Sequence, residues 1–195
     1  MVEAKDKDGN VVLDKEGNPK MEALADVLKK QLPYFVCQAD VTKRRLFGSA
    51  KDFTGYAPVD IDHLTPEQLK MVMERMRQYR WVKEGHVSCR QEGGHFIVAM
   101  GKIEVDMTLP EKERKEAYER EYKRRYAEIT DFIQRELGIE VDGQCKDVLR
   151  GFFMSADKEA FIREDVEIFP YDNDALRYDN DNISSVETVI FVKSN

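Results

Sequence analysis

The segment from Val59 to Asp62 alternates apolar and acidic side chains. Because neighbouring side chains of a β-strand point to opposite faces, Val59 and Ile61 would enter a core. Asp60 and Asp62 would then project together from the other face. Carboxylates that leave water at a strand end are costly unless a cation or hydrogen-bond donors compensate them. The alternation therefore predicts a divalent-metal site; the alternative is that Asp60 is a hydrogen-bonded edge residue and Asp62 an ordinary loop residue.

The composition is that of a globular protein. The chain has 195 residues, of which 42% are hydrophobic and 35% charged, enough for one domain with appendages. No apolar run approaches the ~20 residues that span a bilayer, and the first residues lack the apolar core of a secretory signal, so we expect a cytoplasmic protein without a membrane partner. The net charge of −7 argues against a surface that is basic throughout and wraps nucleic acid, but it leaves room for a local basic groove.

The three cysteines, Cys37, Cys89 and Cys145, stand far apart and form no CxxC pair or Cys/His cluster. This spacing argues against structural zinc and against a disulfide framework. Cys89 lies near His95 in the sequence, but no second base accompanies them. A catalytic thiol is therefore not favoured.

Helices are predicted with defined ends. Thr65 is typical of an N-cap residue, because a proline follows it and Gln68 stands at the capping-box position. The longest helix begins after Pro110, carries apolar residues at the helical spacing and ends at Gly138. A shorter helix is predicted over residues 21–30.

Short strands are predicted around these helices. A glycine-containing turn before His95 joins two of them into a β-hairpin. Further strands are expected over residues 34–37, 139–142, 152–155 and 186–192. The pattern predicts an α+β fold with a mixed or antiparallel sheet flanked by helices. We expect three regions: a hairpin or arm with the first helix in residues 1–30, a core in residues 31–170, and an acidic tail with a strand in residues 171–195.

Polar side chains gather at the predicted strand ends. In chain order they are Asp60, Asp62, Ser88, His95, Asp142, Lys146, Asp147 and Arg150. Three of these carboxylates can hold one or two divalent cations, and histidine or arginine can donate to phosphate oxygens. The set favours phosphoryl or nucleotidyl transfer over hydrolysis of peptides or sugars.

In this order the motifs resemble the archaeo-eukaryotic primase superfamily, whose RRM-like sheet carries an Asp-hydrophobic-Asp motif, a Ser-to-His turn and a later hydrophobic-Asp motif. Asp60-Ile61-Asp62 is similar to the first, Ser88 through His95 to the second, and Val141-Asp142 to the third. Over about residues 28 to 170 the chain more closely resembles the primase-like domain at the N-terminus of virulence-associated E-type proteins of bacterial mobile elements.

The resemblance implies an RRM-like primase-polymerase core that transfers nucleotides to a primer or template-bound strand in DNA replication. It implies that Asp60, Asp62 and Asp142 bind Mg²⁺ or Mn²⁺. They would be catalytic together with His95, and the four side chains are expected to converge in one cleft. The residues implied for nucleotide or phosphate contacts are Ser88, Arg90, His95, Lys146 and Arg150. The implied partners are nucleotides, single-stranded or primed DNA, and a helicase domain or subunit.

The second motif departs from the pattern of these proteins, which usually reads Ser-Pro-Ser-Gly-x-Gly before the histidine. Gln91 stands where a glycine would let the backbone approach a phosphate closely, and Glu92 adds negative charge. Two alternatives to nucleotidyl transfer therefore stay open. One is a module that binds single-stranded nucleic acid without catalysis. The other is a metal-dependent nuclease, because the same carboxylates can activate water.

Overall fold

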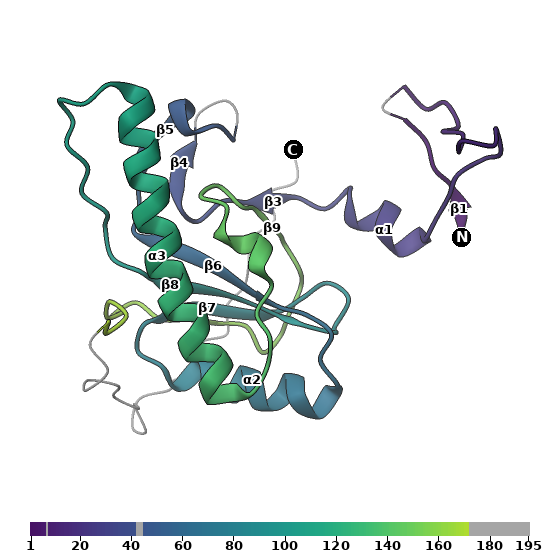
Figure 1. Cartoon of the computed structure of the whole chain (residues 1–195). Coiled ribbons are helices and arrows are strands. Elements are labelled where there is room, and N and C mark those ends of the chain that lie inside the picture. Colours follow the sequence, from purple (N-terminus) through teal and green to yellow (C-terminus); the bar gives the residue numbers. More distant parts are fainter. Residues whose placement is uncertain (7, 42–44, 172–195) are drawn as a thin grey trace. The chain divides into compact units, whose positions relative to one another are not determined.

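The residues that the computed structural model describes (Figure 1) are 1–6, 8–41 and 45–171. The chain divides into two compact units, the first ending at Tyr34 and the second beginning at Phe35. The predicted strand over residues 186–192, and all of the predicted tail after Tyr171, lie outside the described residues.

The first unit contains β1 (Val2–Glu3), β2 (Met21–Glu22) and α1 (Leu24–Lys29). β1 pairs antiparallel with β2, and two turns of the same kind lie between them. In each turn one aspartate side chain, Asp6 or Asp14, accepts the backbone amides of the residues two and four positions later. The helix predicted over residues 21–30 is shorter than expected, because its first residues pair as a strand.

An antiparallel sheet of four strands forms the centre of the second unit. Its strands, in spatial order, are β10 (Phe161–Ile162), β7 (Val82–Val87), β8 (Gly94–Ala99) and β6 (Tyr56–Ile61). β7 and β8 form the predicted hairpin, and β6 pairs with β8 along its whole length. The prediction of an α+β fold with an antiparallel sheet is confirmed.

The register of the sheet separates an apolar face from a polar face. Val59 of β6 is paired with Phe96 of β8, and both side chains are fully buried in the core. The next pair, Asp60 with His95, points to the opposite face, because paired residues share a face and successive residues alternate. The alternation that the sequence predicts is therefore present, and β6 ends one residue before Asp62.

α2 (Pro66–Gln78) begins where the sequence predicts. The Thr65 side chain accepts the amide of Gln68, and the Gln68 side chain accepts the amide of Thr65, which completes the capping box. The sulfur of Met73 lies 3.4 Å from the place that a Cβ at Gly94 would fill. This helix therefore covers the apolar face of the sheet with its buried residues, Val72, Met73 and Met76.

α3 (Glu111–Leu137) is the longest helix, and Figure 1 shows it standing across the strands of the sheet. Arg125 reaches from it to the backbone carbonyl oxygens that follow β8. Its buried residues are Tyr118, Tyr122, Tyr126, Ile129, Phe132 and Ile133. The helix ends at Gly138, whose φ of 66° is left-handed, as predicted. Among the described residues, no helix combines the length and the apolar character needed to cross a membrane.

Residues 139–142 do not form the predicted strand. They pass the outer edge of β6 and make one backbone hydrogen bond to it, from the amide of Asp142 to the carbonyl of Asp60 at 2.8 Å. A strand needs a ladder of such bonds, but the amide of Val141 donates to a side chain of α3 instead. The chain then turns into the short helix η2 (Gly143–Lys146).

Two further pairs of short strands are present. They are β3 (Tyr34–Phe35) with β9 (Phe152–Phe153), and β4 (Ala39–Val41) with β5 (Ala50–Phe53), the latter preceded by η1 (Phe47–Ser49). The strands predicted over residues 34–37 and 152–155 are thus present but only two residues long.

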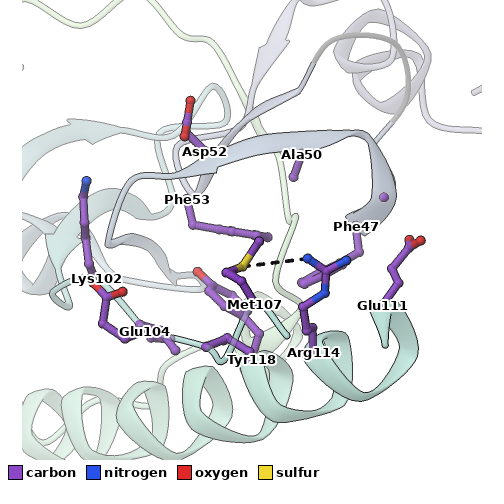
Figure 2. A pocket seen from close by; sticks show the side chains of 13 residues that line it. Phe47, Ala50, Asp52, Phe53, Lys102, Glu104, Met107, Glu111, Arg114 and Tyr118 are labelled. Atoms are coloured by element: carbon purple, nitrogen blue, oxygen red, sulfur yellow. Dashed lines mark hydrogen bonds between the residues drawn. The ribbon is translucent and has the colours of Figure 1, made fainter. Parts of the chain in front are cut away.

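A hollow of about 520 Å³ opens between β5, the segment after β8 and the start of α3 (Figure 2). The rings of Phe53 and Tyr118 contact each other in its wall, with 4.0 Å between centroids and 31° between planes. Arg114 lies across it, and its Nη1 atom donates to the sulfur of Met107. Charged side chains of both signs line the hollow, so no single kind of ligand charge is favoured there.

Replacing Gly85 by alanine should destabilise the sheet. A Cβ at this position would lie 2.4 Å from the Phe161 ring and 2.8 Å from the Phe96 ring, which are both buried. Overpacking of this kind costs about 1–3 kcal/mol. Urea unfolding, followed by the fluorescence of Trp81, should show that loss. The control is Gly143→Ala, whose Cβ would meet nothing within 4 Å; it should change the free energy of unfolding by less than about 0.5 kcal/mol. Equal stability of the two variants would contradict the register of β7.

Candidate metal centre

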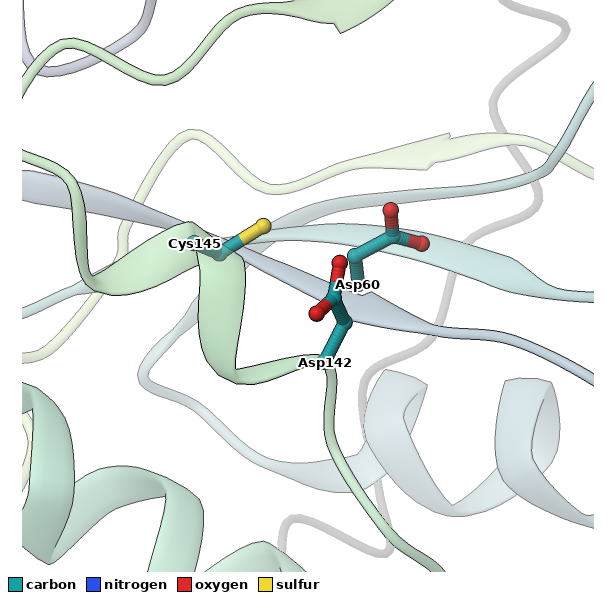
Figure 3. A group of neighbouring side chains, drawn as sticks. All are labelled: Asp60, Asp142 and Cys145. Carbon is teal, nitrogen blue, oxygen red and sulfur yellow. The ribbon is translucent and has the colours of Figure 1, made fainter.

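Two aspartates from distant parts of the chain meet at the outer edge of β6. Asp60 lies within that strand and Asp142 just ahead of η2, and the backbone hydrogen bond between them holds them side by side. One oxygen of each carboxylate and the sulfur of Cys145 all lie within 4.8 Å of one another. Figure 3 shows the three side chains gathered in one small group, which we call the donor group. Its position shares no residue with the hollow beside β5.

The hydrogen bond from Asp142 also shows how Asp60 faces its neighbour in the sheet. The carbonyl of Asp60 turns outward to accept it, so Asp60 and His95 form a non-hydrogen-bonded pair, in which side chains lie closest. Nε2 of His95 is 3.3 Å from Oδ1 of Asp60. The contact has the distance of an ion pair without the geometry of a hydrogen bond, and Oδ1 has no hydrogen-bond partner among the described residues.

His95 is enclosed by other side chains. It is 3% exposed, and its ring stacks on that of Phe152 with 4.4 Å between centroids and 8° between planes. Its Nδ1 atom lies 3.3 Å from Nε2 of His86. Both ring nitrogens therefore face other side chains, and the predicted contact of His95 with a phosphate requires one of these contacts to open.

Asp62 is exposed beyond the end of β6 and does not belong to the donor group. It lines a hollow of about 490 Å³ together with Asp142, which belongs to both. Gly93 brings the hairpin turn against it, because a Cβ there would lie 2.5 Å from the carbonyl oxygen of Ile61 and 2.8 Å from Oδ1 of Asp62. The structure thus brings together Asp60, Asp142 and His95 and leaves Asp62 at the adjoining hollow.

The residues predicted to contact phosphates come from two sides of the donor group. Ser88 is buried where the hairpin turn closes, and Arg90 is exposed within that turn. Lys146 ends η2 and is exposed, and Arg150 follows, half-buried. Burial raises the pKa of Cys145, and the positive charge of Arg150 opposes that rise, which places its guanidinium near the donor group.

Burial raises the pKa of the Cys145 thiol to about 12, and the negative charges of Asp60 and Asp142 add to this effect. The thiol is therefore protonated at neutral pH. The donor group then offers two carboxylates and a neutral sulfur, and carboxylate oxygens are the ligands that Mg²⁺ and Mn²⁺ prefer. Softer cations such as Cd²⁺ prefer a thiolate. The donors present fit a hard divalent cation.

Tyr126 brings a hydroxyl from α3 into the same environment. The side chain is 3% exposed, and its oxygen has no hydrogen-bond partner among the described residues. Burial is the largest cause that raises the pKa of Tyr126, and the negative charges of Asp142 and Asp60 add to it. A buried hydroxyl of this kind is costly unless it is satisfied, so it is a candidate partner for a water or ligand oxygen near the donor group.

Glu84 and His86 lie on the same face as His95, although neither was among the predicted site residues. Oε1 of Glu84 is 3.2 Å from Nδ1 of His86, whose Nε2 meets His95. The available signal was two polar residues at a spacing of two inside an apolar strand. A β-bulge between Val82 and Glu84 shifts the register, and strand alternation alone could not place the pair on the correct face.

Replacing Cys145 by serine should separate hard cations from soft ones. The neutral thiol contributes little to Mn²⁺, so we expect its dissociation constant to change less than about threefold, whereas Cd²⁺ should bind at least about tenfold more weakly. Isothermal titration calorimetry measures both. Cys89→Ser is the matched control, because Cys89 lies in the hairpin turn outside the donor group. If Mn²⁺ binding fell as much as Cd²⁺ binding, the sulfur and not the carboxylates would hold the hard cation.

The resemblance to the primase-like domain of virulence-associated E-type proteins is wrong as a family assignment. A family model described as BT4734-like, N-terminal domain, matches residues 27–161, which include the four-stranded sheet up to Phe161, both long helices and the donor group. No curated protein and no solved structure matches the chain. Motifs of two or three residues, such as Val141-Asp142, are too short to separate one family from another. The chain belongs to the family of BT4734-like N-terminal domains.

Proposed function

We propose that the second unit catalyses metal-dependent nucleotidyl transfer, adding nucleotides to a primed or single-stranded DNA in replication. The observation that carries the proposal is the donor group, in which the carboxylates of Asp60 and Asp142 meet beside the buried imidazole of His95. Carboxylates that hold divalent cations at a fixed separation are a common means of aligning phosphates for displacement. A buried imidazole beside them adds a hydrogen-bonding group at the same place.

The residues of the donor group suit Mg²⁺ or Mn²⁺. When bound, such a cation offsets negative charge on phosphate oxygens and on the attacking hydroxyl. Asp60 and Asp142 would hold it, and β6 and the backbone bond keep their separation fixed, as a cation with strict coordination geometry requires. We place the incoming nucleotide in the hollow that Asp62 and Asp142 line.

Basic side chains on two elements support a nucleic-acid substrate. Arg90 lies in the hairpin turn, and Lys146 and Arg150 lie in and after η2. In a chain of net charge −7 they supply local positive potential for a phosphate backbone. Glu92, in the same turn as Arg90, also has a structural role, because its carbonyl accepts the amide of Leu64 at 2.8 Å. A helicase domain or subunit would provide the unpaired strand.

Replacing Asp60 or Asp142 by asparagine should abolish Mn²⁺ binding and primer extension. Groups behind metal ligands contribute about 10–100-fold to affinity or activity, so loss of a ligand itself should cost at least about 100-fold. Calorimetry with Mn²⁺ and extension of a labelled DNA primer measure the two effects. The exposed carboxylate of Asp147 is the matched control, and Asp147→Asn should retain both.

Other outcomes would assign a different function. If the wild-type protein extends no primer with Mn²⁺, the transferase proposal fails. Cleavage of DNA in place of extension would indicate a nuclease, because the same carboxylates can activate water. Salt-sensitive binding to single strands that EDTA leaves unchanged, without turnover, would indicate a binding module.

A further inference from the structure

A row of polar side chains crosses the sheet and ends at the donor group. Glu84 and His86 come from β7, His95 from β8 and Asp60 from β6. Oε1 of Glu84 lies 3.2 Å from Nδ1 of His86, and Nε2 of His86 lies 3.3 Å from Nδ1 of His95. Nε2 of His95 then lies 3.3 Å from Oδ1 of Asp60. Each ring nitrogen of both histidines thus faces another member of the row.

A β-bulge puts Glu84 and His86 on this face. Val82 lies on the apolar face, and the register shifts immediately after it, so that His86 is paired with His95. Without the shift His86 would be paired with Gly94 and would enter the apolar face. Bulges are frequent next to active sites, where they re-aim side chains.

The two imidazole rings are shielded from water. His86 and His95 are each 3% exposed, and their rings meet edge to face with 5.1 Å between centroids. Phe152 covers the face of the His95 ring. Buried polar groups keep their orientation because moving them leaves a donor or acceptor unpaired. The row is therefore able to fix which nitrogen of His95 carries hydrogen.

A count of the N–H groups shows which nitrogen donates in each contact of the row. At alkaline pH, where both imidazole rings are neutral, the two rings carry two N–H groups, whereas the row contains three contacts. The contact at Glu84 and the contact between the rings have hydrogen-bond geometry, and the contact at Asp60 does not. Nδ1–H of His86 therefore donates to Glu84, and Nδ1–H of His95 donates to His86. Nε2 of His95, which makes no hydrogen bond to Asp60, then carries no hydrogen.

We propose that Glu84 and His86 are positioning residues that hold His95 as its Nδ1–H tautomer and so keep hydrogen off the nitrogen that meets Asp60. Oδ1 of Asp60 then keeps its lone pairs for a cation, with which an N–H group would compete. The row would affect metal binding indirectly, by orienting a side chain next to the ligand Asp60, as hydrogen-bonded groups around metal sites do. The effect on catalysis rests on the proposed function. The tautomer of His95 does not depend on it.

Substitutions along the row test this role. His86→Leu removes the acceptor for Nδ1–H of His95, whereas His86→Gln keeps an oxygen close to the place of Nε2. Glu84→Gln removes the charge that orients His86 and keeps the size of the side chain. The matched control is Glu164→Gln, an exposed carboxylate that follows β10. If His86→Leu does not fold, the His95 tautomer in Glu84→Gln, compared with that in Glu164→Gln, tests the positioning role.

Nitrogen-15 spectra of the imidazole rings report the tautomer in the metal-free protein, and the chain has three histidines to assign. At alkaline pH we expect the Nδ1–H tautomer of His95 in the wild type, in His86→Gln and in Glu164→Gln. A mixture of tautomers is expected in His86→Leu and in Glu84→Gln. A wild-type His95 with hydrogen on Nε2 overturns the proposal, and so does a tautomer that both row substitutions leave unchanged.

Binding of Mn²⁺ and primer extension measure the consequence. Mn²⁺ affinity should fall about 10–100-fold in His86→Leu and return to within about threefold of wild type in His86→Gln. A fixed Nδ1–H tautomer in a protein that extends no primer would reject nucleotidyl transfer and support the positioning role. Primer extension with unaltered Mn²⁺ affinity in a variant whose His95 tautomer is mixed would reject the positioning role and support nucleotidyl transfer.

Discussion

The backbone hydrogen bond from Asp142 to Asp60 is the interaction on which the site depends. It joins the segment after α3 to the open edge of β6 through the Asp60 carbonyl. The pairing of β6 with β8 directs that carbonyl outward and places the Asp60 side chain against His95. A single bond of this kind contributes only about 1 kcal/mol to stability. It persists because both flanks are fixed, by the helix end at Gly138 on one side and by Cys145, buried in the core, on the other.

The two carboxylates of the donor group repel each other, and the positive charge of Arg150 nearby offsets part of this repulsion. Two unit charges less than 5 Å apart repel by roughly 3 kcal/mol at an effective dielectric constant of about 20, which exceeds the contribution of the bond that joins them. The packing of β6 and η2 around the core, together with the positive charge of Arg150, therefore maintains the close approach of Asp60 and Asp142. A bound divalent cation would offset the rest of the repulsion between the two carboxylates.

Local signals in the sequence predicted much of the fold and half of the site. The capping box at Thr65, the stop at Gly138 and the alternation around Asp60 each depend on a few neighbouring residues, and the structure confirms all three. The approach of Asp142 was expected, but through a strand that does not form, because one hydrogen bond and a side-chain contact replace the ladder. His86 escaped prediction because the bulge that re-aims it depends on pairing with β8, which no local pattern encodes.

The bulge in β7 has a consequence for how related chains should be compared. Pairing before it and pairing after it follow opposite parities, so the loss or gain of one residue there would exchange the inward and outward sets of the strand. Glu84 and His86 would then enter the hydrophobic interior, and Gly85 would face outward. Two homologues that share all the other residues of this strand would therefore differ in chemistry through the insertion or deletion of a single residue.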